Sequence, residues 1–110
     1  MGNKQQELDL RLRDILTECN VDLSEGHIYF QPPESLRMVY PALVYNLSRR
    51  DYEQADNQLY AQFLIWDLIW ISKTPLDFVV DALMSRLDCC VPTREYVSDG
   101  LYHTQLSLYF

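Results

Sequence analysis

The first 20 residues place apolar side chains three and four positions apart, with charged residues between them. The apolar positions are Leu8, Leu12, Ile15, Leu16 and Cys19. This spacing predicts an amphipathic helix over residues 4–19 that ends near Asn20. Asn3 with Gln6 matches a capping box at its start.

A second helix is predicted after residue 73. Thr74 suits its cap, Pro75 its first turn, and Asp77 the positive end of the helix dipole. The helical period then continues through Leu76, Val79, Val80, Leu83, Met84 and Leu87. This helix also has an apolar face, with which it can cover a sheet.

Two short strands are predicted after the first helix. Residues 27–31 form the first of them, which Pro32 and Pro33 stop. Residues 32–38 connect this strand to a second one over residues 41–47. In the second strand one face carries Ala42, Val44 and Asn46.

The C-terminal residues predict a β-hairpin. Strands over residues 93–98 and 101–110 flank Asp99-Gly100, a two-residue turn of the favoured primed type. In the last strand one face carries Tyr102, Thr104, Leu106, Leu108 and Phe110, and the other carries His103, Gln105 and Ser107.

The most apolar segment of the chain is residues 59–71. As a strand it has apolar side chains on both faces, so both faces need cover. A continuous helix is the alternative, but the aromatic and β-branched content favours a strand. The two helices can cover one face, and a chain of 110 residues has nothing left to cover the other.

From Asn46 to Gln58 the chain is mainly polar. Such a stretch buries too little apolar area to offset the entropy of ordering it. It therefore predicts a long exposed loop, over residues 46–58, that joins two antiparallel strands. A loop of this length in a compact domain is usually functional or disordered.

These elements predict a single α+β domain with the order α-β-β-β-α-β-β. Its sheet is antiparallel-rich, has about five strands, and carries two helices packed on one face. The hydrophobic fraction is 48%, with eight Tyr, four Phe and two Trp. This supply is enough for a core without disulfides or metals.

The charge balance argues against polyanionic ligands. The net charge is −7, with nine Lys and Arg against 16 Asp and Glu. A protein that grips phosphates needs a basic face, so specific binding of nucleic acid or anionic lipid is not expected. An acidic surface does suit a channel through which DNA slides without sticking.

The residues predict no catalytic, cofactor-binding or metal site. His27 and His103 lie in different strands, with no Cys or carboxylate at ligand spacing, and each is expected to be a surface or boundary histidine. Only three glycines are present, too few for a phosphate-cradling loop. The acids of the second helix, Asp77, Asp81 and Asp88, lie on its polar side, where solvated carboxylates belong.

The three cysteines are Cys19, Cys89 and Cys90, and an adjacent pair forms neither the usual disulfide nor a Cys-x-x-Cys clamp. Free thiols in a reducing compartment are therefore expected. Residues 3–9 are mostly polar rather than a signal peptide, and the run Phe63–Ile71 is too short to span a membrane. The chain is expected to be made in the cytoplasm and to stay off membranes.

Two interpretations of Trp66 and Trp70 stay open, because they share one face of a strand that is apolar on both faces. They form the core, or they form a subunit interface. The polar stretch offers further contact residues. The interface hypothesis consists of Arg49, Arg50, Tyr52, Tyr60, Trp66 and Trp70.

Four short motifs occur in order along residues 27–110. The first is Tyr29-Phe30-Gln31-Pro32-Pro33-Glu34-Ser35, and Met38-Val39-Tyr40-Pro41-Ala42-Leu43-Val44-Tyr45 follows it. The third motif, Ala55-Asp56-Asn57, precedes Tyr60, and the fourth closes the chain in two parts, Asp99-Gly100-Leu101-Tyr102-His103 and Leu108-Tyr109-Phe110. In order and spacing they resemble the tail terminator (tail-completion, neck) proteins of long-tailed bacteriophages. Family members carry a more polar third strand, with acidic residues and a proline before the second helix, and here the chain departs from the pattern.

The resemblance implies a virion protein of the tail and neck. Such a protein closes the growing tail tube as a homo-oligomeric ring, usually hexameric, and offers a surface to the head-tail connector. Its partners are the tail tube protein and the connector protein, and the genome passes through its lumen. Within the same class the alternative is a connector-stopper or other neck protein. From a different class, the alternative is a cytoplasmic regulatory or ligand-binding α+β domain.

Overall fold

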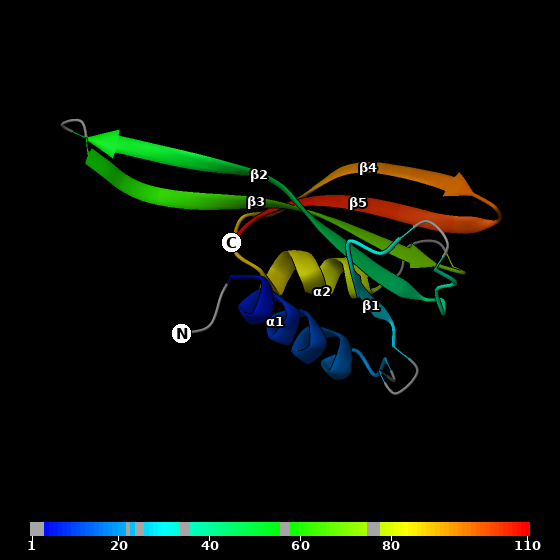
Figure 1. Ribbon diagram of the computed structural model, residues 1–110. Helices are drawn as coiled ribbons and strands as arrows, with labels where there is room; N and C mark the ends of the chain where they lie inside the picture. Colours follow the sequence, from blue (N-terminus) through cyan, green and yellow to red (C-terminus); the bar gives the residue numbers. More distant parts are fainter. Residues whose placement is uncertain (1–3, 22, 24–25, 34–35, 56–57, 75–77) are drawn as a thin grey trace.

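The structure is a computed structural model that describes residues 4–21, 23, 26–33, 36–55, 58–74 and 78–110. Its elements are α1 (Lys4–Glu18), β1 (Ile28–Phe30), β2 (Ala42–Ala55), β3 (Gln58–Ser72), α2 (Phe78–Arg86), β4 (Cys90–Ser98) and β5 (Leu101–Tyr109). The predicted order α-β-β-β-α-β-β is confirmed. Both helices lie on the same side of one sheet (Figure 1). No helix in the described ranges is long and apolar enough to cross a membrane.

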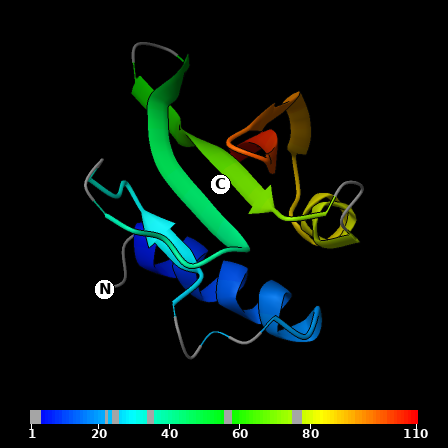
Figure 2. The same ribbon diagram turned by 90° about the vertical axis from the view of Figure 1, so that its right-hand side faces the viewer.

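The sheet has five strands in the order β1-β2-β3-β5-β4. β1 pairs with β2 in parallel, and the other three pairings are antiparallel. The α+β class predicted from the sequence is thus confirmed, with a mixed, mainly antiparallel sheet. The sheet is strongly twisted, as the view turned by 90° shows (Figure 2).

The helices form where the apolar period predicted them. In α1 the four buried residues are Leu8, Leu12, Ile15 and Leu16. Asn20 has a φ of 64°, the left-handed conformation that ends many helices, and confirms the predicted end. In α2, Val79 and Leu83 are buried. Asn3, and the second helix's predicted start at Pro75–Asp77, lie outside the described residues.

The core lies between the helices and one face of the sheet. β3 contributes Leu64, Trp66, Leu68 and Trp70, β2 contributes Leu43 and Tyr45, and β5 contributes Leu106 and Leu108. The hydroxyl of Tyr45 donates to Oδ2 of Asp9 at 2.6 Å and accepts from Nε2 of Gln5 at 2.7 Å. Burial, followed by the hydrogen bond to Asp9, raises the pKa of Tyr45. These bonds fasten α1 to the centre of the sheet.

The C-terminal hairpin confirms its predicted turn. Asp99 and Gly100 have φ angles of 54° and 75°, as a primed two-residue turn requires. β4 begins at Cys90 rather than at residue 93, because pairing with β5 continues past an irregularity between Pro92 and Arg94.

The predicted loop over residues 46–58 is wrong. β2 continues through this polar stretch to Ala55, and β3 starts at Gln58. Backbone pairs join the two strands from Ala42 and Ile71 out to Ala55 and Gln58, with register shifts after Leu47 and Glu53. Backbone hydrogen bonds along a hairpin do not depend on apolar side chains, so the polar composition did not prevent strand formation.

Candidate functional site

The β2–β3 hairpin continues beyond the rest of the sheet as a two-stranded arm. β5 pairs with β3 from Ser72 only as far as Ile65, and the amide of Phe110 donates to the carbonyl of Leu64 at 3.0 Å. Among the described residues, 50–55 and 58–63 therefore pair only within the β2–β3 hairpin, and they are called the arm here. Figure 1 shows the arm projecting past both helices.

An isolated two-stranded ribbon is marginally stable in water. The arm nevertheless extends the molecule to a longest dimension of 51 Å, against 30 and 29 Å for the other two. A ribbon that extends away from its own core gains stability when another surface packs against it. The arm is therefore a candidate contact element.

The six residues of the predicted interface divide between the arm and the core. Arg50, Tyr52 and Tyr60 lie on the arm, and Arg49 lies at its base, where it pairs with Ile65. These four predicted contact residues are thus brought to one element, although it is a strand pair and not a loop.

Trp66 and Trp70 do not belong to an exposed surface, and this part of the interface prediction is corrected. Each is 1% exposed and packs in the core beneath the helices of its own chain. The ring of Trp66 lies 6.1 Å from that of Tyr45 and 6.2 Å from that of Phe30. The two tryptophans share a face, as predicted, but it is the face that the helices cover.

The opposite face of the sheet was expected to be exposed and apolar, and it is so only in part, with Asp67 and Ile69 half-buried at its centre. Val44, Ile65 and Ile71 alternate with the core residues and yet are 7%, 4% and 5% exposed. The exposed apolar side chains of this face lie toward its margin, at Val91 and Tyr109. This face as a whole is therefore a poorer docking surface than the sequence indicated.

The sheet has a free edge on each side. On one side, β1 covers β2 only from Leu43 to Tyr45, and Oε1 of Gln31 accepts from the amide of Leu47 at 3.3 Å. Beyond this point no described strand covers the outer edge of β2 along the arm. On the other side, β4 pairs with β5, and no described strand pairs with the outer edge of its nine residues.

Three planar side chains form a column on β4 and β5. The guanidinium of Arg94 lies 4.6 Å from the ring centroid of Tyr96. Tyr96 in turn stacks on His103, with centroids 4.7 Å apart and ring planes 15° apart. Tyrosine and arginine, together with tryptophan, are enriched among the residues that contribute most of the binding energy at interfaces. The edge at β4 thus carries an ordered contact group that the sequence analysis missed.

The other residues considered as chemical groups are His27 and the three cysteines. His27, expected at the surface or its boundary, is instead buried, and its Nδ1 lies 2.6 Å from the carbonyl oxygen of Pro41. Cys19 and Cys90 are buried thiols and Cys89 is an exposed one; burial raises the pKa of the Cys90 thiol to about 11. Among the described residues no group of three or more His, Cys, Asp or Glu is placed to hold a metal ion.

Comparison with known proteins gave no match: no protein-family model and no curated protein is similar to this sequence. The fold and its surfaces therefore define the chain as an α+β domain with two free sheet edges and a projecting β-arm. The assignment to a family stays a prediction from the four sequence motifs.

Proposed function

We propose that this chain is a structural protein of a bacteriophage virion that assembles as a ring, caps the tail tube and joins the tail to the head connector. The family resemblance supports the place in the virion. The free edges on both sides of one sheet, one of them extended by the arm, are the observation that carries the assembly.

The assembly would be heterologous. The arm edge of β2 and the edge of β4 lie on opposite sides of the sheet, so one copy's arm can meet the next copy's β4. A contact between two different surfaces repeats from copy to copy. It forms a closed ring when the rotation between neighbouring copies brings the last copy into contact with the first. Strand addition at an exposed edge supplies backbone hydrogen bonds that need no special side chain.

The charge of the chain is compatible with this role. With a net charge of −7, every copy in a ring adds an excess of acids to the assembly. A like-charged lumen lets DNA pass without retaining it. The proposed partners are further copies of the chain, the tail tube protein and the connector protein; neither specific nucleic-acid binding nor a membrane is part of the proposal.

A lysine on the β4 edge is expected to block assembly. Val91 is 55% exposed on this edge strand, and a charge there opposes strand addition, because the new neighbour would desolvate it. The variant Val91→Lys should give a folded monomer in size-exclusion chromatography with light scattering.

The matched control is Leu10→Lys, which places the same charge on the outer face of α1, where Leu10 is 65% exposed. The control is expected to assemble like the parent chain. Equal assembly of both variants would remove the β4 edge from the interface.

A ligand-binding regulatory domain is the second candidate, and one observation favours it. A cavity of about 380 Å³ lies between α2 and the β4–β5 hairpin, within the size range of small-ligand sites. The two candidates differ in their prediction for the purified protein: the regulatory domain remains a monomer, and the ring subunit self-associates.

A further inference from the structure

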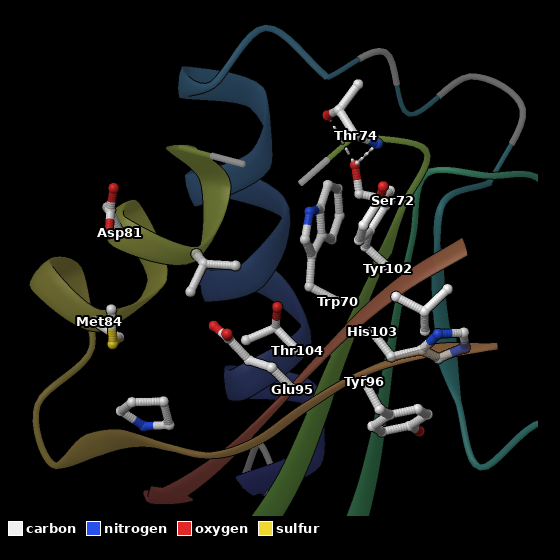
Figure 3. Close-up of a pocket in the computed structure, with 13 residues that line it drawn as sticks. Trp70, Ser72, Thr74, Asp81, Met84, Glu95, Tyr96, Tyr102, His103 and Thr104 are labelled. Carbon is white, nitrogen blue, oxygen red and sulfur yellow. Dashed lines mark hydrogen bonds between the residues drawn. The ribbon is translucent and has the colours of Figure 1, made fainter. Parts of the chain in front are cut away.

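The edge strand β4 carries charges of opposite sign on its two faces. Its charged residues are Arg94 and Glu95. Glu95 pairs with Thr104 and lines the cavity beside α2, so it lies on the helix side of the sheet. Arg94 pairs with Gln105 on the outer side. In Figure 3 the carboxylate of Glu95 points toward α2, and the ring of Tyr96, the next residue, points away from it.

The arm carries the reverse pattern along its free edge. In β2, Arg50 pairs with Leu64, a residue of the core, so Arg50 occupies a helix-side position. Asp51 and Glu53 occupy the alternate positions, on the outer side. Arg49, at the base of the arm, precedes them on that side. Within residues 50–55 the helix side therefore has a cation and the outer side has two acids.

The backbone of Glu95 is directed to the open edge of β4. The amide of Tyr109 donates to the carbonyl of Cys89 at 3.3 Å, so the odd-numbered residues of β5 face β4. Tyr96 pairs with one of them, His103, and therefore faces β5. Because backbone groups alternate in direction along a strand, the N–H and C=O of Glu95 face outward.

The backbone of Tyr52 is directed to the free edge of the arm by the same alternation. The carbonyl of Leu64 accepts from the amide of Phe110, so Leu64 faces β5 and Phe63 faces β2. Asp51 pairs with Phe63 and therefore faces β3. The N–H and C=O of Tyr52 consequently face outward, as a residue that joins a new strand requires.

We propose that the arm of one copy adds to β4 of the next copy as an antiparallel strand, in a register selected by these charges. Tyr52 then lies opposite Glu95, and Glu53 lies opposite Arg94. Arg50 is the diagonal neighbour of Glu95, within reach of a long side chain. This inference rests on the proposed ring and specifies how its copies meet.

A ring accounts for the direction of the added strand and for the side on which the helices lie. β2 and β4 run in opposite directions within one copy, because the three intervening pairings are antiparallel. A rotation axis roughly parallel to the strands preserves these directions and keeps all helices on one side of the sheet. With one sheet turned over, Arg50 would meet Arg94 and Glu53 would meet Glu95, and like charges directly opposite are destabilising.

The ends of the two edges fit this register. Ser98, the last residue of β4, falls beside Arg49 at the base of the arm. Up to Leu47 the edge of β2 is covered by β1 and by the side chain of Gln31. A register two residues closer to β1 would place the end of β4 on Gln31. The proposed strand thus begins where the cover of β2 ends.

The test is a charge-reversal cycle in the full-length protein. The single variants are Arg94→Glu, at an exposed residue, and Glu53→Arg, and a third variant carries both changes. The double variant re-forms the pair with its signs exchanged. Light scattering over a concentration series gives the apparent dissociation constant of each variant, and circular dichroism checks its fold. A second cycle, with Glu95→Arg and Arg50→Glu, tests the helix side independently.

Each single reversal should raise the apparent dissociation constant about tenfold or more, because a like-charge contact replaces an attractive one. The double variant should return to within about threefold of the parent, since the coupled pair is restored. The control combines Glu53→Arg with Arg11→Glu on the exposed side of α1, which gives the same net charge without the pair. It should stay as weak as Glu53→Arg alone.

Two results would overturn this inference, and they differ in what they imply for the ring. A parent that assembles, with double variants that show only the summed effects of their single changes, would contradict the strand register and leave the ring in place. A parent with the mass of one chain at every concentration would contradict the ring and the strand addition together.

Discussion

Replacing Trp66 by alanine is expected to lower the free energy of unfolding by about 3–5 kcal/mol, the cost of removing a large aromatic side chain from a packed core. Trp66 is 1% exposed and lies against the rings of Phe30 and Tyr45. Total stabilities of domains are about 5–15 kcal/mol, so this loss is a large fraction of the whole. Urea unfolding followed by circular dichroism measures it.

The control for this variant is Phe78→Ala at the start of α2. Phe78 is 60% exposed, and its truncation should change the free energy of unfolding by about 0.5 kcal/mol or less. A Trp66→Ala protein that unfolds like the parent but fails to self-associate would contradict the core position. It would instead support the second interpretation from the sequence, in which Trp66 belongs to a subunit interface.

Removing the arm is expected to abolish assembly while the domain stays folded. The design replaces residues 51–63 by Asn-Gly, because Arg50 and Leu64 are paired and a two-residue primed turn joins such a pair. The removed residues pair only with each other, so the free energy of unfolding should change by about 1 kcal/mol or less.

Thermal melting by circular dichroism checks the fold of the shortened chain, and light scattering checks its mass. The expected result is a melting temperature near that of the parent and the mass of a single chain. Assembly of the shortened chain at the parent's concentrations would exclude the arm from the interface. Unfolding of the shortened chain would show instead that the arm stabilises the domain.

The element order could be predicted because each signal is local. The spacing of Leu8, Leu12 and Leu16 defines a helix within a few turns, and Asp99-Gly100 defines a hairpin within four residues. The arm could not be predicted in the same way. Its strand from Arg50 to Ala55 is polar, and backbone pairing with β3 orders it. The composition of β3 does not show which segment of the chain pairs with it.

The sequence did not show whether the helices cover the face of β3 that carries the tryptophans, because β3 is apolar on both faces. One signal was available in the sequence. Asp67 lies on the face opposite Trp66 and Trp70, and a carboxylate in the middle of a strand indicates the less covered face. The cavity could not be predicted at all, since Trp70, Val80 and Glu95 come from three elements whose packing is set by the tertiary fold.

The mass of the purified full-length protein in solution tests the central claim most directly. Size-exclusion chromatography with light scattering, over a series of concentrations, compares it with the 13.0 kDa of one chain. The proposed ring predicts a discrete species of several copies, about six times the mass of the chain, with a ring outline in negative-stain electron microscopy. A mass of one chain at every concentration would contradict it.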